Sequence, residues 1–97
     1  MAKYICNTRA TVGIDSAGRN IVEALLFVEL GSSDTSAPKD PVHNPSAAAS
    51  LQPEGISETE TLAVGSMIYN VSANAEHVYI LGTSGKWIGQ KDGTELT

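Results

Sequence analysis

All four prolines of this 97-residue chain lie between Pro38 and Pro53, in a stretch rich in serine, aspartate and asparagine. Proline has no backbone N–H and biases the preceding residue toward extended geometry, so this stretch fits neither a helix nor a central strand. It separates the chain into residues 1–30, a loop or arm over residues 31–64, and residues 65–97. Its composition is typical of a solvated loop that adds little to the core. The alternative is an arm that lies along a neighbouring subunit and becomes ordered only in the assembly.

The N-terminal residues 1–30 predict a β-hairpin. Mildly apolar side chains alternate with mostly polar ones over residues 4–14, which is the period of a strand with one apolar face. Residues 15–18 then have the aspartate and glycine of a tight turn. The apolar run over residues 21–30 would also fit a helix face, but the preceding turn favours a second strand that pairs with the first.

The C-terminal residues predict an antiparallel meander of three short strands. The strands are expected over residues 65–71, 77–81 and 86–90, with a turn-rich connection over residues 72–76. The last residues, 94–97, are expected to be a frayed tail. The predicted fold class is therefore all-β: a small antiparallel sheet or sandwich with an N-terminal β-hairpin, a long proline-rich loop and a C-terminal three-stranded meander.

The chain carries a formal net charge of −5, and most of its acidity lies in the middle segment. Nucleic acids and anionic membrane surfaces are bound through clustered Lys and Arg, whereas the six basic residues here are scattered. We therefore expect no nucleic acid and no membrane as partner. The longest apolar run, Ala24 to Val28, is far too short to span a membrane, and residues 1–4 lack the apolar region of a secretory signal. We expect a protein that is made as a soluble cytoplasmic product and is not exported by the general secretory route.

The candidate chemical groups do not combine into a recognisable catalytic or metal site. His43 and His77 lack the paired spacing of metal ligands. Cys6 is the single cysteine, so an intrachain disulfide is excluded, and it is expected on the apolar face of the first strand as a small hydrophobe. Glu58 and Glu60 are expected to form a solvated acidic stretch rather than a catalytic pair. We expect no enzyme activity, no metal and no cofactor.

A chain of this length with so polar a middle segment is expected to oligomerise, because its folding part buries only a modest core. The expected interface consists of apolar and aromatic side chains of the hairpin and the meander: Tyr4, Ile14, Leu26, Val28, Met67, Tyr69, Tyr79 and Trp87. Alternatively, Tyr79 and Trp87 would stack on sugars, which would make the chain a carbohydrate- or host-surface-binding module.

A resemblance to head-fibre, capsid-decoration and fibre proteins of tailed bacteriophages covers about residues 64–91. It rests on three runs: Gly65-Ser66-Met67-Ile68-Tyr69-Asn70-Val71, Val78-Tyr79-Ile80-Leu81-Gly82 and Ser84-Gly85-Lys86-Trp87. The resemblance implies a virion structural protein of the head-fibre or capsid-decoration type, a homotrimer attached to the capsid surface. Its implied partners are copies of itself and the major capsid or other virion proteins, with a host-surface glycan as a further option. A neck or tail component is the alternative location.

Overall fold

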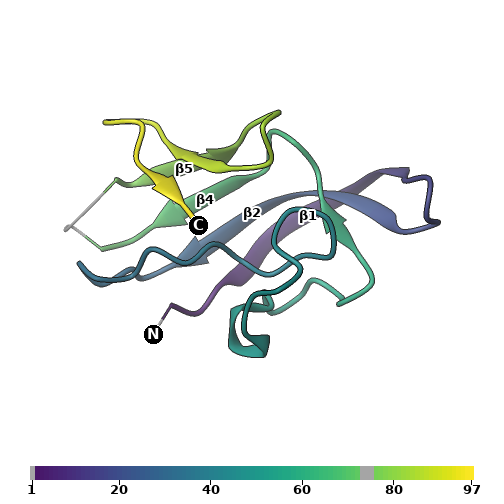
Figure 1. Ribbon diagram of the computed structural model, residues 1–97, viewed down its shortest axis with the longest axis horizontal. Coiled ribbons are helices and arrows are strands. Elements are labelled where there is room, and N and C mark those ends of the chain that lie inside the picture. The colour runs from purple at the N-terminus through teal and green to yellow at the C-terminus, as the bar shows by residue number, and fades with distance from the viewer. Residues whose placement is uncertain (1, 73–75) are drawn as a thin grey trace.

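The computed structural model describes residues 2–72 and 76–97, and within them seven strands form one mixed sheet (Figure 1). The strands are β1 (Ile5–Ile14), β2 (Asn20–Val28), β3 (Thr61–Leu62), β4 (Met67–Asn70), β5 (Val78–Leu81), β6 (Trp87–Gly89) and β7 (Glu95–Leu96), with a 3-10 turn, η1, over Ala49–Leu51. Their order across the sheet is β1-β2-β4-β5-β6-β7, and the short β3 pairs with β2. The predicted all-β fold is confirmed.

The two predicted antiparallel units are joined by a parallel pairing. β1 and β2 form the hairpin, and β4, β5 and β6 form the meander. β4 runs parallel to β2, with Phe27 opposite Tyr69, so the sheet is mixed rather than purely antiparallel. Parallel neighbours need a crossover connection of a dozen or more residues. The proline-rich segment, residues 31–64, supplies this crossover and carries β3, which is also parallel to β2.

The crossover covers one face of the sheet, and in Figure 1 it passes in front of β1 and β2. Its side chains Ala37, Leu51 and Ile56 belong to the hydrophobic core. A backbone bond of 2.8 Å from Cys6 N to Glu54 O ties it to the edge of β1. The prediction of a solvated loop that adds little to the core is therefore wrong. These side chains pack on the apolar face of the chain's own sheet, and Pro38 and Pro53 of the same segment are themselves fully buried.

The face of the sheet under the crossover, which we call the covered face, holds most of the core. Alternate residues along each strand point into it, as the period of two requires. Its buried apolar side chains are Tyr4, Val22, Ala24, Leu26, Val28, Ile68, Tyr79, Leu81, Trp87 and Leu96. The opposite side of the sheet is the open face.

The predicted alternation along β1 holds only as far as Cys6, which is half-buried. The pairing register of β1 with β2 shifts at two places beyond it. Such bulges turn the following side chains to the other face. Arg9 therefore lies opposite Ala24, on the side of the crossover, whereas Val12 and Ile14 near the hairpin tip are more than half exposed.

The C-terminal residues do not form the predicted frayed tail. β7 pairs with β6, and Leu96 is buried. The backbone N–H of Thr97 donates to Thr35 O at 2.8 Å, and Thr97 O accepts a bond of 2.8 Å from Ala37 N. The chain end is thus tied to the beginning of the crossover. The connection predicted over residues 72–76 lies mostly outside the described residues.

Candidate functional site

The open face of the sheet carries two rows of apolar side chains. One row runs Ile5, Phe27, Tyr69 and Val78, and the other runs Leu25, Met67, Ile80 and Ile88. Their neighbours within the strands point to the covered face and, apart from the half-buried Cys6, are buried. No charged side chain lies between these eight residues, so the open face is a continuous apolar surface across five strands. We take it as the candidate functional site.

The centre of the open face is exposed although it is apolar. Ile5 is 46%, Phe27 37%, Met67 39% and Tyr69 44% exposed. The rings of Phe27 and Tyr69 lie 5.8 Å apart at an angle of 60°, a tilted arrangement that aromatic pairs favour. The open face therefore presents an aromatic pair, held by two neighbouring strands, to whatever covers it.

The size of the open face follows from the exposed fractions of its side chains. Ile5, Phe27, Met67, Tyr69 and the adjoining Val71 are 37–57% exposed. With roughly 200 Å² per large side chain, these five together present on the order of 500 Å² of accessible surface. Apolar patches larger than a few hundred Å² are uncommon on monomeric proteins and mark interaction sites.

The rim of the open face is polar. Glu23 lies opposite Ala10 on one side, and Glu95 lies opposite Ile88 on the other; both carboxylates are exposed. At the end of β2 a shallow groove of about 600 Å³ continues the apolar surface, and its lining includes Lys3 and Glu29. An apolar centre with a charged rim is the usual anatomy of a protein–protein interface.

The structure divides the predicted interface residues between the two faces. Tyr4, Leu26, Val28, Tyr79 and Trp87 are buried within the chain on the covered face, and Ile14, Met67 and Tyr69 are exposed. Ile14 lies at the hairpin tip, so the structure brings only the last two together on the open face. The residues missed by sequence reasoning are Ile5, Leu25, Phe27, Val78, Ile80 and Ile88. The alternation within the predicted strands places these six residues on the opposite side of their strands from the predicted interface residues. Alternation alone does not say which of the two sides the rest of the chain covers.

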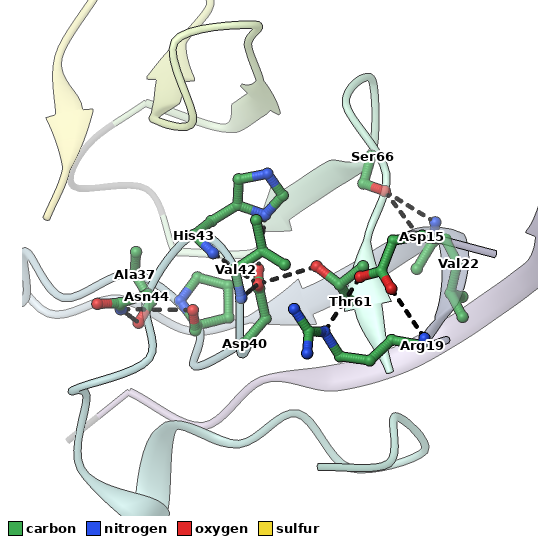
Figure 2. A network of polar contacts seen from close by, with 12 residues as sticks. Asp15, Arg19, Val22, Ala37, Asp40, Val42, His43, Asn44, Thr61 and Ser66 are labelled. Carbon is green, nitrogen blue, oxygen red and sulfur yellow. Dashed lines mark hydrogen bonds and ion pairs between the residues drawn. The ribbon is translucent and has the colours of Figure 1, made fainter. Parts of the chain in front are cut away.

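A second cluster lies at the turn over residues 40–44, within the crossover (Figure 2). Asp40, which is 1% exposed, accepts bonds through Oδ1 from the backbone N–H groups of Val42 and His43, both at 2.8 Å, and from Thr61 Oγ1 at 3.1 Å. Its Oδ2 lies 3.0 Å from His43 Nδ1. Burial raises the pKa of Asp40, but the bonds from His43 and Val42 outweigh it and leave the pKa below its usual value. The cluster fastens the turn at residues 40–44 to β3 within the crossover.

The thiol and the second histidine lie apart from this cluster. Cys6 Sγ contacts Thr8 O at 3.4 Å, and burial raises the pKa of the thiol, which disfavours the reactive thiolate. His77 Nδ1 lies 3.4 Å from Asn70 O. Among the bonds within residues 2–72 and 76–97, neither side chain has a catalytic partner.

Two further carboxylates hold the covered face together. Glu60 forms an ion pair with Arg9 and accepts a bond of 2.8 Å from Ser57 N, so its predicted solvation is wrong, whereas Glu58 is exposed. Glu76, which is 3% exposed, accepts bonds from three backbone N–H groups in the β6–β7 connection. The pKa of Glu60 is lowered chiefly by Arg9. Burial raises the pKa of Glu76, but the bonds from its backbone donors outweigh this effect and leave the pKa below its usual value.

Searches of the described part of the chain find no group of three or more His, Cys, Asp or Glu side chains that could hold a metal ion. They also find no helix there that is long and apolar enough to cross a membrane. Comparisons with protein-family models, with curated proteins and with solved structures find no match for this chain. The site geometry and the sequence pattern are therefore the basis for a functional proposal.

Proposed function

We propose that this chain is a non-catalytic structural protein that works by docking its open face in a larger assembly. The observation that carries the proposal is the continuous apolar surface formed by Ile5, Leu25, Phe27, Met67, Tyr69, Val78, Ile80 and Ile88. Burying apolar surface is favourable by about 25 cal/mol per Å². A surface on the order of 500 Å² therefore contributes a large driving force for association when another protein covers it.

The assembly that we propose is the virion of a tailed bacteriophage, with this chain as a head-fibre or capsid-decoration protein on the capsid surface. Support comes from the resemblance of residues 64–91 to the meander of such proteins. That segment contributes β4, β5 and β6, and hence Met67, Tyr69, Ile80 and Ile88, to the open face. The proposed partners are copies of the chain, as a homotrimer, and the major capsid or other virion proteins. The proposed location implies synthesis in the host cytoplasm.

A carbohydrate-binding role through Tyr79 and Trp87 has less support. Trp87 is 1% and Tyr79 3% exposed, so neither ring face is free to stack on a sugar in this structure. Stacking requires an aromatic face in contact with the ligand. The open face is therefore the better candidate for an interaction, and a neck or tail location would use it in the same way.

The test is the composition of the particle. Phage particles from the genome that encodes this chain are purified, and their proteins are quantified by mass spectrometry. We expect the chain at a fixed ratio to the major capsid protein, and we expect Phe27→Ser/Tyr69→Ser to be lost from the particles. A matched control is Val64→Ser, which removes a side chain that is 48% exposed and lies outside the open face. A chain absent from purified particles contradicts the virion role.

A further inference from the structure

We infer that the open face is covered by the open face of other copies of the same chain. This inference rests on the proposed function, because it names the partner of the same surface. A capsid subunit or an unrelated protein is the competing occupant. Two features of the described residues favour a second copy: the chemistry of the open face and its area.

The chemistry of the open face calls for an apolar partner. The eight side chains offer no charge for a partner's ion pair, and Tyr69 is the one member with a polar group. Interfaces with charged partners instead depend on charge complementarity across the contact. An apolar surface of equal extent is present on every other copy, so self-association supplies a matched occupant at the same concentration.

The area of the open face also suits pairing between copies. Two packed sheets keep their strand directions within about 30° and lie about 10 Å apart, so side chains from both faces interdigitate. Two open faces together bury on the order of 1,000 Å², the lower limit of specific interfaces. An interface at this lower limit is typical of weak or transient association, so we expect an oligomer that depends on protein concentration rather than a permanent one.

The rim predicts how the association responds to salt. Glu23 and Glu95 flank the open face, and the chain has a formal net charge of −5. Although Lys3 lines the groove at one end of the open face, copies that each carry this net negative charge repel one another when they meet face to face. Salt screens exposed charges, with a Debye length of about 10 Å at 0.1 M. Raising the NaCl concentration from about 50 to about 300 mM should tighten self-association, whereas contact with a basic partner surface would weaken.

The experiment is sedimentation equilibrium on the full chain at several concentrations and both salt levels. We expect the wild type to form a reversible oligomer. We expect Met67→Ser/Tyr69→Ser to raise the dissociation constant of that oligomer at least tenfold. Phe27→Ser is the second variant, in case the double variant fails a circular-dichroism test of folding. Val64→Ser should associate as the wild type does. An oligomer that persists unchanged in both folded open-face variants overturns the inference.

A second readout separates failure of this inference from failure of the proposed function. Hydrogen peroxide oxidises exposed methionine to the sulfoxide, so the rate at Met67, followed by peptide mass spectrometry, reports whether the open face is covered. We expect Met67 to become protected as the protein concentration rises. A wild-type monomer in which Met67 is oxidised rapidly overturns self-association but leaves the face free for another protein. A monomer with Met67 protected overturns both proposals.

Discussion

The two faces of this sheet are both apolar, yet they differ in how their polar surroundings are arranged. The covered face lies under a polar crossover, and buried polar groups such as Asp40 in the crossover and Asn70 in β4 have hydrogen-bond partners there, whereas the buried Nε1 of Trp87 has none. Asn70 Oδ1 accepts a bond of 3.1 Å from Leu30 N, and its Nδ2 donates to Glu76 O at 3.0 Å. The open face contains no such anchors. A polar segment can cover an apolar sheet only where each buried polar group finds a partner, so the open face is suited to an apolar cover from outside the chain.

The largest expected effect separates the faces by stability. Trp87→Ala empties a fully buried site on the covered face and should lower the free energy of unfolding by about 3–5 kcal/mol. Tyr69→Ala on the open face should lower it by less than about 1 kcal/mol, because its side chain is 44% exposed. Urea unfolding at a concentration where the chain is monomeric measures both. Equal losses would mean that the two faces are equally covered.

Removing an anchor should have the next largest effect. Asp40→Ala leaves the N–H groups of Val42 and His43 and the hydroxyl of Thr61 without their acceptor. Unsatisfied buried donors cost about 1–3 kcal/mol, so we expect a loss of about 2–4 kcal/mol in unfolding free energy. Asp92→Ala, at an exposed position, is the control and should change it by less than about 0.5 kcal/mol. A loss no larger than the control would show that the crossover does not depend on this carboxylate.

A tight contact on the covered side gives a smaller and more specific test. A methyl group at Gly89 would overlap the carboxylate of Glu76, so Gly89→Ala should destabilise the chain by about 1–3 kcal/mol. In Glu76→Ala/Gly89→Ala the overlap is gone. The double variant should therefore be more stable than the sum of the single losses predicts, with a coupling of about 1 kcal/mol. Additive losses would contradict a direct contact.

The smallest effect near neutral pH comes from the carboxylates that hold the covered face. The folded-state pKa values of Asp40, Glu60 and Glu76 lie below their usual values. Their stabilisation is therefore complete above the unfolded pKa values of about 4 and is lost as the pH falls through the lower folded values. We expect an unfolding free energy that is nearly flat from about pH 7 to pH 5 and that falls below about pH 4.5. Asp40→Asn should flatten that fall, and a stability that rises on acidification would contradict it.

Much of the strand content could be predicted because it depends on local patterns. The period of two and the turn at residues 15–18 predict the β1–β2 hairpin, and the β-branched and aromatic runs predict β4, β5 and β6. The strand at the C-terminal tail was missed because β7 has only two residues, too few to show an alternating pattern. The burial of Leu96 depends on β6 and the crossover. The reversal along β1 was missed because the bulges beyond Cys6 leave no mark in the alternation.

The candidate site was only half predictable for a related reason. Met67 and Tyr69 were expected at an interface, but they were grouped with Tyr79 and Trp87, which lie on the other face. Apolar side chains lie on both faces of β2, β4 and β5. Alternation therefore divides them into two sets, but it does not show which set is buried and which is exposed. The register of β2 with β4 then decides which members of each set become neighbours.

Local sequence alone determined that this chain forms strands, where most of them begin and end, and that a proline-rich stretch must separate hairpin from meander. Only the tertiary structure decided that this stretch crosses back over one face, because parallel pairing of β2 with β4 requires a long connection to pass there. That choice buries Trp87 and exposes Tyr69. The physical reason is that a strand's pattern defines two faces, whereas the path of the connection between strands determines which of them water can reach.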